Sequence, residues 1–418
     1  MSPTRSLPHA TGVRLPFRTL IPRAATLAAA ATLALAACST DRVAAPSRSP
    51  DPTGSEVPPG EKLAVVHWNQ FTQSLTSLRP ISQHAAWRIH TYVTLAQYGA
   101  VEAANTHPAV TRAMIRGAVA GASAPLLQYG FPLDSAGIDA VLRNEEAALP
   151  PAEQADFRVG EGIGRSVAAQ VITRARNDRF TATWSGTVPT GPGKWSSLSN
   201  PPAPPAFPLG GEIATLFLTS GRQFRPAPPP AFGSGAFRDD LAEVRRIADS
   251  RTATQDSLAK FWAMATGTLV AGYWNTVALQ LITVERLGER DAAHILALMN
   301  GAGWDALTAC HDAKYTYWLI RPSGADPAIS PAIGVPNHPS FPSNHACLSG
   351  TSAQILGAMF PAQRGALMAQ ANEAAMSRVY AGIHYRFDAE AGLELARKVA
   401  THALELDRRG WLRHLARP

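Results

Sequence analysis

One stretch near the C-terminus joins two cations through a run of aromatic residues: Lys314-Tyr-Thr-Tyr-Trp-Leu-Ile-Arg321-Pro322. Lys314 and Arg321 are seven residues apart, which is two helical turns, so we expect both side chains to point into one cavity from a single helix face. Pro322 tends to end a helix just before it, which places Arg321 near the helix C-terminus. Two cations facing one cavity predict a binding site for an anion.

A second segment, Pro342-Ser343-Asn344-His345, precedes the apolar run Ala346-Cys347-Leu348. This pattern predicts the start of a helix, with Ser343 at or near the N-cap. The backbone N–H groups of Asn344 and His345 would then have no partner within the helix and could face an anion.

A third segment begins with Ser377-Arg378 and continues to His384 and Asp388. Arg378 supplies a third cation, and an ammonium, guanidinium groups and backbone N–H groups together suit an oxyanion. His384 and Asp388 are four residues apart, so the carboxylate can accept one imidazole proton and orient the ring. His345 and His384 are then free to act as nucleophile or ligand and as proton donor, although either alone would be an ordinary core histidine.

These three segments, in this order and with this spacing, resemble the signature shared by type 2 phosphatidic acid phosphatases (PAP2), bacterial acid phosphatases and vanadium-dependent haloperoxidases. The matching pattern is Lys-x6-Arg-Pro, then Pro-Ser-x-His, then Ser-Arg-x5-His-x3-Asp. The flanks Asp312-Ala-Lys314-Tyr and His384-Tyr-Arg-Phe-Asp388 resemble the soluble bacterial haloperoxidase branch. The specific match covers the last third of the chain and implies an all-α helical bundle of the PAP2/vanadium haloperoxidase type.

The resemblance implies a role for each matching residue. His384 would be the axial vanadium ligand of a haloperoxidase, or the phosphate nucleophile of a phosphatase. His345 would be the acid–base histidine, and Asp388 would orient His384. The cofactor would be vanadate in the first case, and none would be needed in the second. The residues implied to bind the phosphate or vanadate oxygens are Lys314, Arg321, Ser343, Asn344 and Arg378.

Three positions differ from the family pattern. Asn344 stands where the family usually has glycine, which puts a side chain beside the anion. His311 replaces an aromatic residue common in haloperoxidases, and His338 lies where those enzymes carry phenylalanine or histidine near the halide. We expect His311 and His338 either to line the cavity or to pack near it. The other histidines without metal-ligand spacing are interpreted as surface or core residues: His67, His84, His90, His107 and His294.

The first 37 residues are typical of an export signal. Four arginines precede an apolar run, 24–37, that is too short and too alanine-rich for a typical membrane-spanning helix. It ends in Leu35-Ala36-Ala37-Cys38, which resembles the bacterial lipoprotein cleavage box, so we expect acylation of Cys38; an ordinary secretory signal is the alternative. Ser39 favours the outer membrane, facing the periplasm, if the organism is Gram-negative. Residues 38–60 are typical of a flexible tether.

Net charge and cysteine content allow further predictions about binding partners and disulfide bonds. The formal net charge is +7, but the predicted signal carries four of the arginines and no acidic residue. The chain has no lysine-rich run and no alternation of aromatic and basic residues, so nucleic acid is not an expected partner. Cys310 and Cys347 flank the predicted site, and they are interpreted either as a disulfide between the motif helices or as two small buried side chains.

The remaining chain predicts one all-α domain over residues 61–418. Thr187–Ser234 is dense in proline and glycine, and we expect this long loop to wrap the helical core and rim the cavity. Apolar residues at helical spacing predict helices at Ala85–Asn105, Leu133–Leu149, Gln154–Asn177, Asp239–Asp249, Thr254–Thr266, Tyr273–Leu287 and Arg290–Met299.

Three functions remain as alternatives at this stage. The first is a vanadate-dependent haloperoxidase-like enzyme that oxidises a halide with hydrogen peroxide. The second is a periplasmic acid phosphatase that acts on a phosphate monoester through a phosphohistidine at His384. The third is a non-catalytic helical binding lipoprotein. The intact set of charged and proton-transferring residues argues against the third, and the flanks of Lys314 and His384 favour the first.

Overall fold

The computed structural model describes residues 62–264 and 269–416. Within these two ranges, helices are joined by turns and irregular segments, and the β pairing is limited to one isolated bridge between Lys194 and Leu319. The predicted all-α fold class is therefore confirmed. The predicted signal (1–37), the tether (38–60) and the acylation site Cys38 lie outside the described residues. Over the described part of the chain, no helix is both long and apolar enough to cross a membrane.

The helices before the site-bearing segments form the first part of the bundle. They are α1 (Ala64–Leu78), α2 (Gln83–Ala104), α3 (Arg112–Gly130), α4 (Ser135–Ala147), α5 (Pro151–Arg176), α6 (Gly235–Asp249), α7 (Ala253–Met264) and α8 (Leu269–Val284). The later helices are α9 (Glu289–Tyr317), α10 (Pro322–Ala325), α11 (Asn344–Met359), α12 (Arg364–Tyr380), α13 (Arg386–Arg408) and α14 (Trp411–Ala416).

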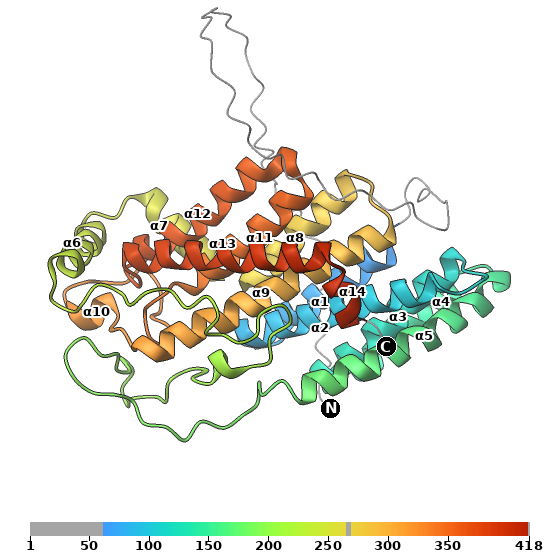
Figure 1. Ribbon diagram of the computed structural model, residues 1–418, viewed down its shortest axis with the longest axis horizontal. Helices are drawn as coiled ribbons and strands as arrows, with labels where there is room; N and C mark the ends of the chain where they lie inside the picture. The colour runs from blue at the N-terminus through green and yellow to red at the C-terminus, as the bar shows by residue number, and fades with distance from the viewer. Residues whose placement is uncertain (1–61, 265–268, 417–418) are drawn as a thin grey trace, which may run out of the picture. The chain divides into compact units, whose positions relative to one another are not determined.

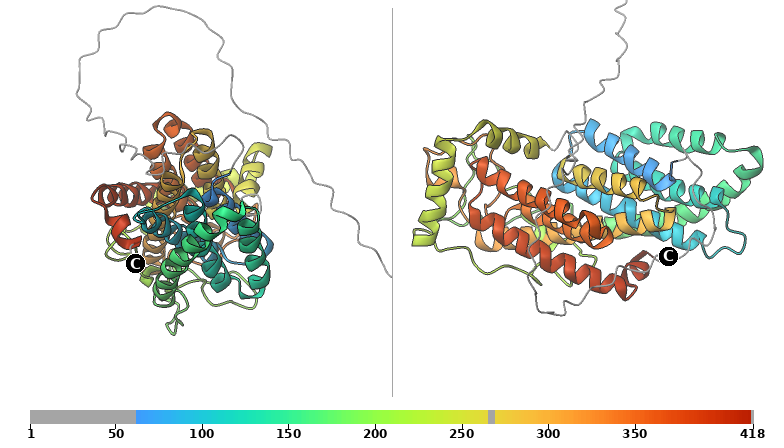
Figure 2. Two further views of the ribbon diagram at one scale, coloured as in Figure 1. Left: turned by 90° about the vertical axis from the view of Figure 1, so that its right-hand side faces the viewer. Right: turned by 90° about the horizontal axis from the view of Figure 1, so that it is seen from above.

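Helices α3, α4 and α5 lie together at one end of this bundle, and α6, α7 and α10 lie at the other (Figure 1). The two further views agree on this arrangement (Figure 2). Helices α3 and α5 approach so closely that a Cβ atom on Gly160 of α5 would lie 1.8 Å from the carbonyl oxygen of Met114 of α3. Only glycine permits such contact between two backbones.

Helix α9 runs through the core and carries the first cation of the site at its C-terminal end. Its residues from Ala292 to Ala313 are almost all buried, because the helix packs against α2, α11 and α13. Asp305 on α9 also anchors the long loop: its carboxylate accepts backbone N–H groups of Leu216, Phe217 and Leu218 at 2.8, 2.7 and 2.8 Å. The expectation that the proline-rich loop wraps the helical core is therefore confirmed.

Two local predictions need correction. The predicted helix Arg290–Met299 continues to Tyr317, and it ends there because Trp318 adopts a left-handed conformation, with φ 53° and ψ 41°. Arg321 therefore does not lie on the same helix as Lys314, and the proposed single face two turns apart is wrong. Helices α1, α3 and α12 were not expected from the apolar spacing.

Candidate active site

Lys314 lies in the last turn of α9, with its ammonium group fully buried. Nζ donates to the carbonyl oxygens of Pro339 at 3.1 Å, of Ser340 at 2.8 Å, and of Pro342. Burial lowers the pKa of Lys314 below its usual range, because the interior solvates the charged form poorly. Among the described residues the ammonium forms no ion pair, and these three hydrogen bonds all go to carbonyl oxygens.

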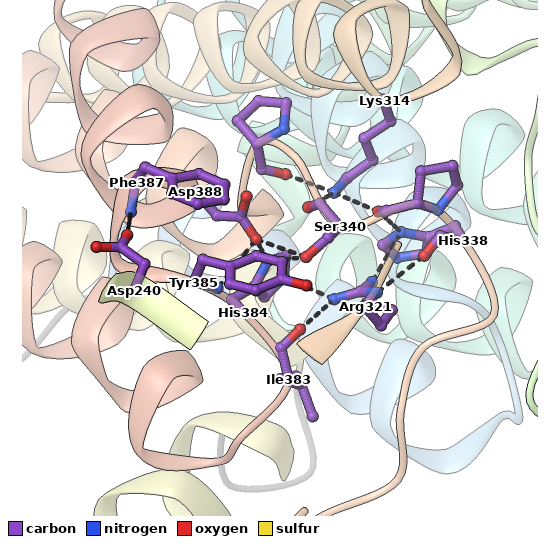
Figure 3. A network of polar contacts seen from close by, with 12 residues as sticks. Asp240, Lys314, Arg321, His338, Ser340, Ile383, His384, Tyr385, Phe387 and Asp388 are labelled. Atoms are coloured by element: carbon purple, nitrogen blue, oxygen red, sulfur yellow. Dashed lines mark hydrogen bonds and ion pairs between the residues drawn. The ribbon is translucent and has the colours of Figure 1, made fainter. Parts of the chain in front are cut away.

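Arg321 reaches the same place from the extended segment after α9 (Figure 3). Its NH1 atom donates to the carbonyl oxygen of Ile383 at 2.7 Å and to Nε2 of His384 at 3.0 Å. Its Nε atom donates to the carbonyl oxygen of His338 at 2.9 Å. Arg321 therefore lies at the site as predicted, although it comes from an extended segment and not from the helix of Lys314. Burial lowers its pKa to about 10.

Arg378 is the third buried cation and lies in the last turn of α12. NH2 donates to the carbonyl oxygen of Ala259 at 2.6 Å, and Nε donates to Oγ of Ser377 at 3.0 Å. Burial lowers the pKa of Arg378 to about 9. Its charge also acts on His345, so the guanidinium group belongs to the same cluster.

The predicted helix start is confirmed, since Ser343 is the N-cap residue of α11. Its backbone N–H donates to the carbonyl oxygen of Asp388 at 2.9 Å, while its side-chain Oγ is buried and has no partner among the described residues. Helix α13 packs closely here, because a Cβ atom on Gly392 would lie 2.9 Å from the carbonyl oxygen of Ser343. The hydroxyl therefore does not cap the helix and remains available to a ligand.

The predicted contact between His384 and Asp388 is present, at 2.7 Å between Nδ1 and Oδ2 (Figure 3). It forms at a helix start rather than along a helix, because Asp388 is the third residue of α13 and its carboxylate also accepts the N–H of Tyr385. Ser340 Oγ donates to the same oxygen at 2.5 Å. Burial raises the pKa of Asp388.

These contacts fix the tautomer of His384. Nδ1 carries a proton for the Asp388 carboxylate, and Nε2 accepts from the Arg321 guanidinium group. Burial, followed by the charges of Arg321 and Lys314, lowers the pKa of His384 well below its usual range, so the ring is neutral. Nε2 therefore presents a lone pair among the cations, which is the atom that a nucleophile or a metal ligand requires.

His345 is the second residue of α11 and lies in its first turn. Its Nε2 atom is 2.9 Å from the carbonyl oxygen of Trp262, so this nitrogen carries the proton. Burial, and after it the charge of Arg378, lower the pKa of His345 to about 3. A neutral His345 with a positively charged neighbour can take up a proton once an anion offsets that charge.

The two additional histidines are also brought to the site. His338 Nδ1 accepts from NH2 of Arg321 at 3.1 Å, and the rings of His311 and His338 have centroids 5.7 Å apart. His311 Nε2 contacts the side-chain amide of Asn344 at 3.2 Å and Nε2 of His84 at 2.9 Å. His84, interpreted from sequence as a surface or core residue, is therefore part of this cluster. It comes from α2, and no local pattern indicates the contact.

The cysteines flank the site as free thiols that are completely buried. Cys310 on α9 and Cys347 on α11 have their Sγ atoms 2.6 Å apart. The sequence left open a disulfide or two packed side chains, and the structure brings the two sulfur atoms together without a bond.

The site carries more positive than negative charge, which favours the binding of an anion. Lys314, Arg321 and Arg378 are buried cations that form no ion pair among the described residues, whereas Asp388 is the one buried carboxylate in contact with His384. Buried charges without partners are unfavourable. A tetrahedral oxyanion such as phosphate or vanadate fits, because it would supply negative charge and acceptors for the unpartnered Ser343 hydroxyl and the first-turn N–H groups of α11.

Comparison with known proteins agrees with this geometry. Residues 294–409, which contain all three motif segments, match the PAP2 superfamily. A bacterial vanadium-dependent iodoperoxidase is similar in fold, with TM-score 0.68 and 21% identity over 82% of this chain and 95% of that chain. The apo-type bacterial vanadium-dependent chloroperoxidase gives TM-score 0.65 and 15% identity over 81% and 94%. The holo-type structure gives 0.62 and 14% over 89% and 97%. No curated protein sequence matches the chain.

The fold is thus that of the vanadium-dependent haloperoxidases. Residues 294–409 match the model of the PAP2 superfamily, and the resemblance predicted from the three motif segments is confirmed.

Proposed function

We propose that this protein is a vanadate-dependent haloperoxidase-like enzyme. The overall reaction consumes a halide, hydrogen peroxide and one proton, and gives a hypohalous acid and water. Vanadate, when bound, supplies a Lewis-acidic centre at which hydrogen peroxide is activated toward the halide.

The chain's own residues would hold the oxyanion and move the proton. Lys314, Arg321 and Arg378 would neutralise the charge on its oxygens, since each is buried and lacks an ion-pair partner among the described residues. His384 would offer the Nε2 lone pair as ligand, and Asp388 keeps that nitrogen free by binding the proton at Nδ1. His345, whose Nε2–H donates to the Trp262 carbonyl oxygen, would carry the proton that the reaction consumes at Nδ1.

One observation carries most of the proposal. His384 Nε2 lies 3.0 Å from the Arg321 guanidinium group and is unprotonated because Nδ1 donates to Asp388. A neutral imidazole lone pair beside three buried cations suits an electrophilic centre that is surrounded by anionic oxygens. The likeness of the whole fold to vanadium-dependent iodo- and chloroperoxidases supports the choice of vanadate.

The test compares vanadate loading with phosphate-ester hydrolysis in the same protein. Purified protein would be assayed for oxidation of iodide, bromide and chloride by hydrogen peroxide, with and without added vanadate. We expect halide oxidation that depends on vanadate, is lost in His384→Ala and is retained in His107→Ala, which removes a partly buried histidine outside the site. Vanadate-independent activity, or none with any halide, would contradict the proposal.

A phosphomonoesterase remains the second candidate, because the same lone pair on His384 could attack phosphorus. The match to the PAP2 superfamily over residues 294–409 favours it. In that case His345, once protonated, would assist the departing alkoxide. A phosphohistidine at His384, trapped during rapid turnover of a phosphate ester and accompanied by no halide oxidation, would establish this function instead.

We further propose that the chain is exported and anchored to the cell envelope through an acyl group on Cys38, at the outer membrane facing the periplasm. The support is the Leu35-Ala36-Ala37-Cys38 sequence after an apolar run. Labelling with a radioactive fatty acid should mark the wild-type chain and leave Cys38→Ala unmarked. Equal labelling of both chains, or none, would contradict acylation at this residue.

A further inference from the structure

His84, His311 and Asn344 form a chain of hydrogen-bonding groups that the motif roles do not use. They come from α2, α9 and α11, so residues far apart in sequence meet beside the site. His311 Nε2 lies 2.9 Å from His84 Nε2 and 3.2 Å from Nδ2 of the Asn344 amide. Phe207 of the long loop packs against His84, with ring centroids 4.4 Å apart.

Both histidines of this chain are neutral. Burial lowers the pKa of His84 to about 4, and burial lowers that of His311 well below its usual range. The Lys314 ammonium adds to both effects, and the rings of His311 and His338 lie near each other. Each neutral imidazole ring has one N–H and one lone pair, so the direction of every hydrogen bond in the chain can be worked out.

If His311 Nε2 carries no proton, its single lone pair must accept from both His84 and the Asn344 amide. The amide oxygen of Asn344 is then buried with no partner among the described residues. If His311 Nε2 carries the proton, it can donate to the lone pair of His84 Nε2 and to the Asn344 amide oxygen. The amide is then rotated by 180°, which exchanges O and N without changing the contact.

The second arrangement suits the surroundings better. It leaves an NH2 group instead of a carbonyl oxygen unpaired, next to Ser343, whose Oγ also lacks a partner among the described residues. An NH2 group attracts an oxyanion, whereas a carbonyl oxygen would repel it. It also leaves a lone pair instead of an N–H group at His311 Nδ1, which is buried and has no hydrogen-bond partner among the described residues.

We propose that the side-chain amide of Asn344 is an additional donor to the bound oxyanion, and that His311, held by His84, fixes the amide in the donating orientation. Asn344 is then a residue that binds phosphate or vanadate directly, whereas His311 and His84 are positioning residues. The inference rests on the oxyanion site of the proposed function but requires no halide oxidation.

The experiment measures binding of inorganic phosphate by isothermal titration calorimetry, with orthovanadate as competitor. Asn344→Gly removes the amide, and we expect phosphate affinity to fall about 10-fold, as for the loss of one hydrogen bond to a charged group. Asn344→Asp replaces the donor with a carboxylate of the same shape, and we expect a loss of more than about 100-fold. An acidic residue in the first turn of α11 favours the helix, so N344D should melt no lower than wild type without phosphate.

The positioning roles are tested through coupling. His311→Phe should weaken phosphate binding about as much as N344G, and the N344G/H311F double variant should bind no more weakly than either single variant. His311→Gln, which can still donate to the amide oxygen, should recover most of the affinity, and His84→Phe should have a smaller effect than H311F. A merely structural role for His311 would give additive losses and no recovery by glutamine.

The outcomes separate this inference from the proposed function. Wild-type phosphate affinity in N344D or in N344G would overturn the role of the amide, even if halide oxidation were observed. Additive losses in N344G/H311F would overturn the positioning role of His311. If wild-type protein bound neither phosphate nor vanadate, the oxyanion site and this inference would both be wrong. Vanadate-independent halide oxidation combined with the expected affinities would contradict only the proposed function.

Discussion

Anion binding should be linked to protonation of His345. In the structure, burial and the Arg378 charge hold the pKa of His345 at about 3, so the ring is neutral near pH 6. A bound dianion opposes the effect of Arg378 and stabilises the imidazolium form. A unit charge at about 6 Å in an effective dielectric constant of about 20 contributes about 2.8 kcal/mol, or about 2 pKa units. A dianion should therefore raise the pKa of His345 from about 3 to about 7.

The sign of the pH dependence follows from this shift. Because the complex binds the proton more tightly than the free protein, anion binding takes up protons between the two pKa values, and affinity falls as the pH rises. Sulfate is the suitable probe, since it stays a dianion throughout this range. We expect its dissociation constant to increase about tenfold from about pH 5 to about pH 6 and to level off above about pH 7.

Calorimetry in two buffers of different ionisation enthalpy gives the number of protons taken up at about pH 5.5. His345→Asn should lower that number by nearly one. Any remainder reports other groups, of which Asp388 is the first candidate because burial raises its pKa. His107→Asn, at a partly buried histidine outside the site, is the matched control and should change nothing. Equal proton uptake in wild type and H345N would refute the link between His345 and the anion.

Three further outcomes are expected. Asp388→Asn should reduce turnover about 10- to 100-fold, because the ring of His384 remains but loses its orientation and basicity. The circular dichroism spectrum should stay unchanged, and full activity would contradict this prediction. Oxidation with diamide during refolding should join Cys310 to Cys347, whose sulfur atoms already meet, and peptide mapping without reductant would detect the disulfide or its absence. Asp305→Ala should lower the free energy of unfolding by about 3 kcal/mol, because three buried N–H groups lose their acceptor. Urea unfolding measures this loss, and a change below about 1 kcal/mol would contradict the prediction.

The chemistry of the site could be predicted because it is encoded in short segments. The contact between His384 and Asp388 needs only a spacing of four residues, and Ser343 before an apolar run predicts a helix start without reference to the rest of the chain. Because all three segments supply groups that suit one anion, they were expected to lie close together in the structure. Local spacing therefore predicted this contact and this helix start, whereas the residue roles and the type of helical bundle came from the resemblance to a known family.

The route of Arg321 could not be predicted in the same way. A spacing of seven residues is equally compatible with a continuous helix and with a helix that ends between the two cations. In the structure the helix ends between the two cations, because Trp318 adopts a left-handed backbone conformation, which residues other than glycine adopt rarely. Pro322 indicates that a helix must end nearby, but it does not say how many residues earlier.

The helix predicted over Arg290–Met299 ended too early. Gly301 and Gly303 resemble the end of a helix at Met299, yet both lie inside α9. A Cβ atom on Gly303 would lie 2.1 Å from Cζ2 of Trp87, so the residue is small because α2 packs against it. A single sequence does not distinguish a glycine that breaks a helix from one that permits close packing.

The contact of His84 with His311 depends on that packing, since it joins residues 227 positions apart. Nothing near position 84 marks this histidine as different from the other scattered histidines. Its partner could be found only once α2 and α9 lay side by side. Residues that act through a neighbour, rather than through a motif, therefore need the three-dimensional structure to be found.

The three buried cations of the site donate hydrogen bonds to backbone carbonyl oxygens. Lys314, Arg321 and Arg378 all have lowered pKa values because burial disfavours their charged forms. Carbonyl dipoles from the segment around Pro339 and from Ile383 and Ala259 offset part of this penalty. An oxyanion would offset the rest, so binding should stabilise the fold itself. The same charges that make the free protein less stable are those that make the anion bind, and this holds whether the bound anion is vanadate or phosphate.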